Sequence, residues 1–188
     1  VNELRGDYTN ISGVIPKLFH NKPILYSLQF LNNWSEHYWG EFLFLSGDDI
    51  QRNKVPETGQ LYLVELVFVV IGCWMLFKNM DRKWLFVFAW LLVAPIPAAL
   101  TFQSPHALRS ENMVIPLELI SAFGIIQSVF VLKTVVKNKS AVKVGTALIG
   151  IILIWSVARY VHMYYVHMSQ EYPFSSQYGV KELVSFVG

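Results

Sequence analysis

The chain has 188 residues, of which 54% are hydrophobic and 15% aromatic, and its mean hydropathy is +0.40. This composition is too apolar for an ordinary water-soluble domain of this length and indicates a protein embedded in a lipid bilayer. The net charge is only +2 and no basic run could follow a phosphate backbone, so nucleic acid is excluded as a partner. Cys73 is the only cysteine, which excludes a disulfide framework or a zinc cluster.

The N-terminal sixty residues are too polar to cross a membrane, and we predict that they form an extracytoplasmic loop. The first twenty residues lack the basic-then-apolar pattern of a signal peptide, so we interpret the chain as a piece of a longer protein. Within the loop, apolar residues recur at helical spacing between residues 24 and 45, with polar residues on the opposite side. This pattern predicts a helix over 24–45 that lies in the outer interface of the bilayer.

A polar turn follows this helix, from Ser46 to Asn53. Asp48, Asp49 and Glu57 offer oxygen ligands for a divalent cation, but they lack the spacing of a calcium loop. A structural turn, for which Gly and Asp are commonly used, is the preferred interpretation. We therefore assign no metal site, and a divalent cation is the one cofactor that the pattern would allow.

Four apolar segments are long enough to span a hydrocarbon core about 30 Å thick, which needs roughly 20 apolar residues, with about 17 still sufficient. They are 61–77, 84–100, 113–132 and 144–164. The prolines at 95 and 97 predict a kink or a stop at the end of the second segment. The predicted fold is an all-α integral membrane protein with about four transmembrane helices, a membrane region over 61–168, and an extracytoplasmic tail over 169–188.

Charge predicts the orientation of these spans. The loops at 78–83 and 133–143 together hold seven Lys or Arg residues, whereas the loop at 101–112 holds one, Arg109. By the positive-inside rule the two basic loops are cytoplasmic, and residues 1–60, the 101–112 loop and the tail lie outside. This topology predicts a multi-pass membrane protein with its functional face outside.

Several polar residues on or near the outer side are candidates for a site. Arg109 suits a phosphate because its guanidinium fork binds two oxygens at once, although an ordinary lipid headgroup would serve equally well. His106 precedes it in the same loop. Glu65 and Glu118 fall within spans, where a carboxylate is costly unless it is paired or reaches water, and both lie near an outer helix end. The outer end of a helix is therefore as good an interpretation of Glu118 as a functional role.

Three stretches of the sequence carry a family likeness. They are Glu41-Phe-Leu-Phe-Leu-Ser-Gly47-Asp48 with Arg52 and Gly59-Gln-Leu-Tyr-Leu, then Pro95-Ile-Pro97 leading into Pro105-His-Ala-Leu-Arg109, and finally Gln177-Tyr-Gly-Val-Lys-Glu-Leu-Val184. Together they resemble the dolichyl-phosphate-mannose protein mannosyltransferases and their bacterial relatives, which include the aminoarabinose transferase of lipid A. They occur in matching order and cover nearly the whole chain. The resemblance implies the membrane-embedded GT-C fold, and the likeness of the last stretch to the bacterial branch implies that the membrane is the plasma membrane.

The resemblance implies transfer of a sugar from a polyprenyl-phosphate donor to a protein, lipid or glycan acceptor on the outer side. Arg109, His106 and Arg52 are the candidates for contact with the donor phosphate, and Asp48 and Glu118 are further polar candidates. The catalytic base that the family uses belongs to a loop N-terminal to this chain, so the catalytic residue is left unknown and the chain alone is expected to be inactive.

Two other classes of function compete with this interpretation. Glu65, Glu118 and the proline-broken helix also fit a part of a transporter or channel. A non-catalytic membrane scaffold is the other alternative, and it would need no chemistry from His106 or Arg109. The clustering of polar residues at the outer face favours the transferase.

Overall fold

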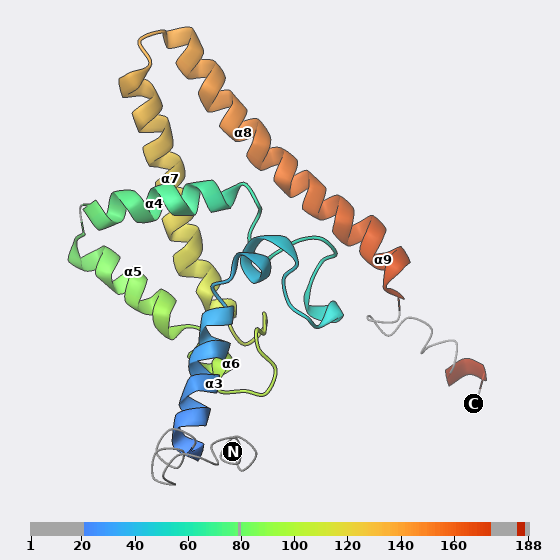
Figure 1. Cartoon of the computed structure of the whole chain (residues 1–188). Coiled ribbons are helices and arrows are strands. Elements are labelled where there is room, and N and C mark those ends of the chain that lie inside the picture. The colour runs from blue at the N-terminus through green and yellow to red at the C-terminus, as the bar shows by residue number, and fades with distance from the viewer. Residues whose placement is uncertain (1–20, 79, 174–183, 187–188) are drawn as a thin grey trace, which may run out of the picture.

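The computed structural model describes residues 21–78, 80–173 and 184–186, and it is all-helical within them (Figure 1). Segments 1–20 and 174–183 of the predicted outer loop and tail lie outside the described residues. The α-helices are α3 (Lys22–Glu36), α4 (Glu65–Lys78), α5 (Arg82–Val93), α6 (Ile96–Ala99), α7 (Val114–Val135), α8 (Lys139–His162) and α9 (Met168–Glu171). Short turns of 3-10 helix at Gln51–Asn53 and Glu111–Met113, and of π-helix at Glu41–Leu45 and Met163–His167, complete the structure.

Three stretches of helix have the length and apolar composition of membrane spans. They are Arg82–Ala99, Glu111–Val135 and Lys139–Glu171. The last two contain the third and fourth predicted spans, and the first covers the second predicted span except for its last residue. The prolines interrupt the first of these as predicted, because α5 ends at Val93 and α6 begins at Ile96. The apolar segments of the sequence thus form the long helices.

The first predicted span, 61–77, differs from the prediction. Its helix, α4, has 14 residues, which at about 1.5 Å per residue is roughly 21 Å, short of a bilayer's hydrocarbon core. Residues 61–64 are held outside the helix because the Leu61 N–H donates to the Leu43 carbonyl at 2.8 Å. The Glu65 carboxylate then accepts the Tyr62 N–H at 3.0 Å and closes the first turn. The part of the chain that the structure describes therefore has three helices of spanning length where four were predicted.

The predicted interfacial helix over 24–45 is also shorter than expected. α3 ends at Glu36, and the chain turns before the π-helical turn at Glu41–Leu45. The Tyr38 and Trp39 amides donate to carbonyls only three residues back, which tightens the helix end. The prediction was wrong here because His37 is fully buried against another loop, which apolar periodicity does not reveal.

The break at Pro95 is where α3 attaches to α5. A proline at 95 has no N–H to donate to the Leu91 carbonyl one turn earlier. The Tyr38 hydroxyl donates to that carbonyl instead, at 2.9 Å, and the Trp34 indole N–H donates to the Leu92 carbonyl at 2.9 Å. Burial raises the pKa of Tyr38 to about 12, so its hydroxyl stays protonated as the donor that this contact needs.

The tightest packing in the chain is the crossing of α4 over α7 (Figure 1). A Cβ placed on Gly72 would collide with the Ile120 carbonyl, and one on Gly124 would collide with the Phe68 carbonyl. Two glycines thus let the backbones touch, as is common where helices associate in membranes. The crossing fixes α4 although that helix is too short to span.

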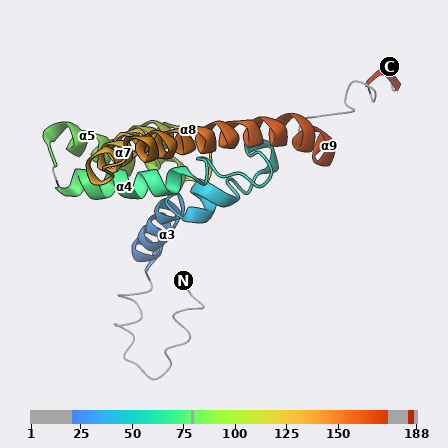
Figure 2. The ribbon, with the colours of Figure 1, turned by 90° about the horizontal axis from the view of Figure 1, so that it is seen from above.

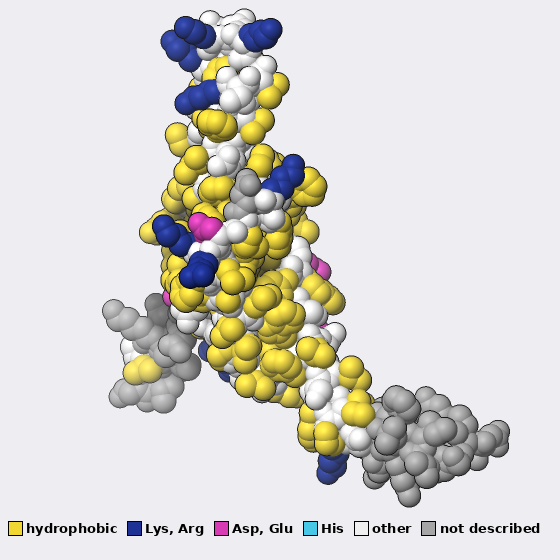
Figure 3. Space-filling model, turned by 90° about the vertical axis from the view of Figure 1, so that its left-hand side faces the viewer, with side chains coloured by type: hydrophobic (Ala, Val, Ile, Leu, Met, Phe, Trp, Pro, Cys, Tyr) yellow, Lys and Arg dark blue, Asp and Glu magenta, His cyan; other side chains and the backbone are white. Residues whose placement is uncertain are grey.

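The basic residues lie at particular turns between helices. In Figure 1 the α4–α5 turn lies at the left and the α7–α8 turn at the top, whereas the 100–110 loop and the end of α9 lie at the bottom and lower right. Figure 3 shows Lys and Arg gathered at the first two places with hydrophobic side chains between them. These are the basic loops of the sequence. Which side of a membrane these loops face stays a prediction.

Helix α8 stands apart from the other helices. No residue between Lys139 and His162 is buried, although the helix is highly apolar. It meets the rest of the chain at the α7–α8 turn and again near its other end, where the Tyr160 ring packs against Tyr62. Figure 2 shows α4, α5, α7 and α8 in one layer from which α3 projects. The flanks of α8 are open to lipid.

The glycine crossing makes a direct prediction. Gly124→Ala should destabilise the protein by about 1–3 kcal/mol because the added methyl group meets the Phe68 backbone. Gly150→Ala, on α8, is the control, since its Cβ would meet no atom within 4 Å. Both variants gain the same helix propensity, so the difference between their unfolding midpoints in detergent reports the contact. Equal midpoints would contradict the close crossing.

Candidate functional site

A buried carboxylate holds the outer loops together. Asp48 is completely buried, and its Oδ1 accepts the Ile50 N–H at 2.8 Å. Its Oδ2 accepts the Ala107 N–H at 2.8 Å and the Asn53 side-chain amide at 3.1 Å. The carboxylate therefore fastens the 46–53 turn to the 101–112 loop. Gly47, at φ +69°, provides the left-handed backbone at the start of this turn.

Two histidines extend this buried cluster to α3. The backbone N–H of His106 donates to Nε2 of the His37 ring at 3.2 Å, so Nε2 is the unprotonated nitrogen of that ring. His37 Nδ1 lies 2.8 Å from the Asn33 carbonyl, which can only accept, so Nδ1 carries the proton. Both ring nitrogens are thus committed in the neutral form. The pKa of His37 lies below its ordinary value of 6.5, chiefly because burial disfavours the imidazolium.

His106 is buried as well. Its Nδ1 lies 3.7 Å from Asp48 Oδ2 and has no hydrogen-bond partner among the described residues. The Ser110 hydroxyl donates to the His106 carbonyl at 2.8 Å and keeps the loop closed. His106 is thus enclosed within the outer loops, and it is not presented to a ligand from outside. We refer to Asp48, His37 and His106 as the buried polar cluster.

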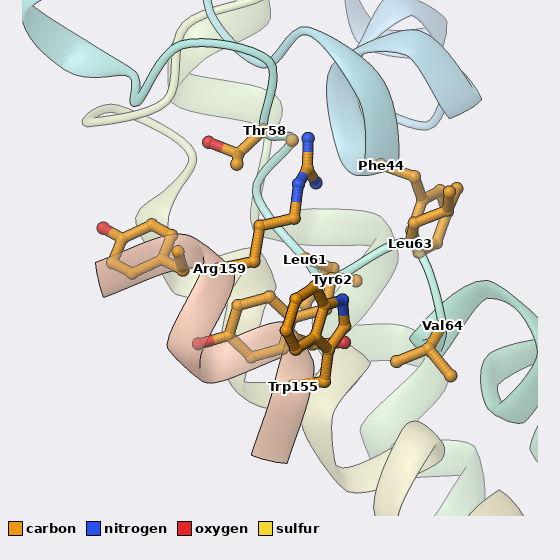
Figure 4. A pocket seen from close by; sticks show the side chains of 11 residues that line it. Phe44, Thr58, Leu61, Tyr62, Leu63, Val64, Trp155 and Arg159 are labelled. Carbon is orange, nitrogen blue, oxygen red and sulfur yellow. The ribbon is translucent and has the colours of Figure 1, made fainter. Parts of the chain in front are cut away.

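Two adjoining pockets lie beside this cluster, at the outer end of α8. One, of about 350 Å³, lies between the 58–64 segment and α8 and includes Tyr62, Trp155 and Arg159 (Figure 4). The other, of about 270 Å³, includes Arg52, Lys54 and Leu108. They share Thr58, Gly59 and Tyr160, and together we call them the outer hollow.

The wall of the outer hollow is a fixed piece of backbone. The Gln60 and Leu61 amides donate to the Phe42 and Leu43 carbonyls at 3.3 and 2.8 Å. A Cβ on Gly59 would collide with the Leu43 backbone, so the close approach requires glycine. The π-helical turn after α3 and the 58–61 segment therefore form one unit. Arg52 and Lys54, at and just after the end of the 46–53 turn, and Arg159 from α8 line the space beside it.

The predicted site residues separate into two groups. Asp48 and His106 are buried structural contacts, whereas Arg52 lines the outer hollow. Arg109 is exposed and follows Leu108, a lining residue, in the chain, but it does not itself line the hollow. The Arg109 guanidinium donates to the Thr101 hydroxyl at 2.8 Å. The structure thus brings the 46–53 turn and the 101–112 loop together but gives their predicted candidates different roles.

The two carboxyl groups predicted within spans are neighbours. Glu65 is buried at the start of α4, and its carboxyl interacts with that of Glu118, which is exposed on the second turn of α7. Tyr62, on the wall of the outer hollow, lies close to both. Sequence spacing did not reveal this pairing because the residues belong to different helices.

Sequence reasoning gave no site role to His37 or Arg159. His37 falls on the polar side of the helix predicted over 24–45, and nothing in the local pattern distinguishes it from a solvated histidine. Arg159 falls near the outer end of the fourth predicted span, where the tyrosines at 160, 164 and 165 are the signal of a position at the membrane surface.

Within the described residues, no group of three or more His, Cys, Asp or Glu side chains could hold a metal ion. Asp48 in particular has both oxygens engaged by N–H donors. These contacts give Asp48 a structural role within the 46–53 turn.

Comparison of the chain with protein-family models, with curated proteins and with solved structures gives no match. The family resemblance thus stays a prediction.

Asp48 should be essential to stability rather than to chemistry. Asp48→Asn places an amide NH₂ against backbone N–H donors and leaves at least one of them unpaired in a buried place, which should cost about 1–3 kcal/mol. Asp49→Asn, one residue further and exposed, should change stability by less than about 0.5 kcal/mol. Thermal unfolding in detergent measures both. A similar midpoint for the two variants would show that Asp48 does not hold the loops.

His37 should make stability depend on pH. Its pKa is lower in the folded protein than in the unfolded chain, so the unfolded chain binds the extra proton first. The stability that the neutral His37 ring contributes is therefore fully present above pH 6.5, the ordinary pKa. It is lost as the pH falls below that value toward the lower pKa of the folded protein. Unfolding midpoints measured between about pH 7.5 and 5 should fall, and His37→Gln should flatten this slope. His162→Gln, at the exposed end of α8, should keep the slope.

Proposed function

We propose that this chain is part of a membrane glycosyltransferase that moves a sugar from a polyprenyl-phosphate donor to an acceptor on the extracytoplasmic side. The chain would lie in the plasma membrane with the outer hollow facing outward. The observation that carries the proposal is the gathering of the 46–53 turn, the 101–112 loop and the outer end of α8 around one cation-lined hollow.

The chemistry of such a donor matches this place in three respects. Its isoprenoid tail needs a bilayer, which the three long apolar helices would occupy. Its phosphate needs a cation at the membrane surface, and Arg109 and Arg52 are exposed there. Its sugar needs an opening to the outside, which the hollow offers. Two of the three stretches that resemble the mannosyltransferases lie side by side at this hollow.

In this proposal each group of residues has a separate role. Arg109 and Arg52 contact the donor phosphate, and the buried polar cluster holds their two loops in register. His106, enclosed and facing Asp48, positions the loop and does not touch the donor. We assign no catalytic base, although Glu118 is exposed near the hollow and pairs with Glu65.

The test is donor binding and consumption in membranes that contain the protein. A radiolabelled polyprenyl-phosphate sugar is supplied to the parent protein and to Arg109→Ala at equal abundance. Loss of a charge-assisted phosphate contact of about 1.5–3 kcal/mol should weaken donor binding roughly ten- to a hundredfold. Arg82→Ala, which removes the same charge from the cytoplasmic side, is the matched control and should bind donor normally.

Two results would count against the proposal. If the parent neither binds nor consumes such donors, the glycosyltransferase function is wrong, and the carboxyl pair of Glu65 and Glu118 makes a transport pathway the next function to test. If donor is consumed but Arg109→Ala behaves like Arg82→Ala, the function stands and the phosphate lies elsewhere.

A further inference from the structure

Arg159 occupies a distinctive position in the structure. It leaves α8 at the point where the helix passes from apolar residues to tyrosines, and its guanidinium reaches toward the Thr58 segment (Figure 4). Among the described residues its polar partner is Glu57, through the carbonyl oxygen at 3.2 Å and the carboxylate at 3.8 Å. A guanidinium has five N–H donors, so most of its donor capacity is available.

The charge balance around this position favours an anion. Arg52 and Lys54 line the adjoining half of the outer hollow, and Thr58, Gly59 and Tyr160 connect the two halves. The carboxylate paired with Arg159 is Glu57, whose side chain is 78% exposed. Exposed ion pairs are weak, so an incoming anion can replace this one. Glu65 and Glu118 lie close to Tyr62 on the wall of the hollow, and neither is paired with Arg159 within the described residues.

An apolar stripe leads directly to the cation. Leu148, Ile151 and Trp155 precede Arg159 at spacings of three and four residues, which places all four on one face of α8. The first three are all more than half exposed and belong to a helix with no buried residue. A charged group at the interface above a continuous apolar stripe is the arrangement that fits a lipid-like molecule.

We propose that the outer end of α8 is a binding site for the phosphate headgroup of a membrane amphiphile. Arg159 holds the phosphate oxygens inside the pocket, and the hydrocarbon tail lies on Leu148, Ile151 and Trp155. Guanidinium binds phosphate with paired donors, and aromatic rings flank the headgroup at the interface. The site needs no sugar and no transfer step, so it goes beyond the glycosyltransferase proposal and does not rest on it.

The phosphate could in principle come from a lipid or from solution, and the structure favours the lipid. The pocket opens beside the apolar face of α8, and Trp155 belongs both to the pocket and to the stripe. Inorganic phosphate would use the cation but gain nothing from the stripe. An amphiphile should therefore bind much more tightly than the free anion.

The experiment is a titration of the purified protein in neutral detergent with dioleoyl phosphatidic acid, followed by native mass spectrometry to obtain the affinity for the first lipid. Arg159→Gln should weaken that affinity about tenfold, whereas Arg82→Gln, at the opposite end of the membrane helices, should leave it unchanged. Glu57→Gln should tighten binding by up to about fivefold because the competing carboxylate is gone. A gain of affinity also requires an intact fold, so this variant keeps the test valid if Arg159→Gln is unstable.

Three outcomes would overturn the inference. Equal affinity for phosphatidic acid and the zwitterionic phosphatidylcholine would remove the role of charge. Competition by inorganic phosphate at the same concentration as the lipid would remove the role of the tail. Equal losses in Arg159→Gln and Arg82→Gln would show that the lipid responds to net charge and not to this pocket. None of these results bears on donor consumption, which is measured with the sugar-bearing lipid alone.

Discussion

The Asp48 carboxylate and the His37 ring each receive a backbone N–H from the 104–110 loop, and the whole outer part of the structure depends on these two hydrogen bonds. They connect α3, the 46–53 turn and the loop before α7, segments that are 59 and 69 residues apart in the chain. A buried carboxylate is costly unless donors surround it, and here three N–H groups do so. The cost of burial therefore selects one arrangement of the loops.

This arrangement separates structural polar residues from accessible ones. Because Asp48 and His106 face inward, the exposed cations Arg52, Arg109 and Arg159 are carried on a backbone that cannot shift freely. Tyr38 and Trp34 complete the frame by satisfying the carbonyls exposed at the Pro95 break. A rigid frame with cations at its rim suits recognition of a phosphate at a membrane surface, where the position of the charge matters more than proton transfer.

The sequence predicted what depends on local pattern and missed what depends on distant contacts. Length and apolarity identified α5, α7 and α8 because these properties act within one helix. α4 came out shorter because the Leu61 N–H is drawn to the Leu43 carbonyl, a contact that no window of sequence contains. The burial of His37 and the pairing of Glu65 with Glu118 could not be predicted for the same reason. Arg52 and Arg109, the predicted candidates for phosphate contact, are both exposed, as arginine commonly is. Their contact with a phosphate stays a prediction.

The isolation of α8 gives the outer hollow its chemical character. α4 and α7 pack closely against each other through two glycines. Among the described residues, α8 contacts the rest of the chain chiefly near its two ends. α8 has the length and composition of a membrane span and no buried residue, so in a bilayer lipid would reach the same face that ends at Arg159. The pocket is then bounded by protein on one side and by the bilayer on the other. A ligand that enters it meets water, cations and hydrocarbon within one helical turn, and only a molecule with a charged head and an apolar tail satisfies all three.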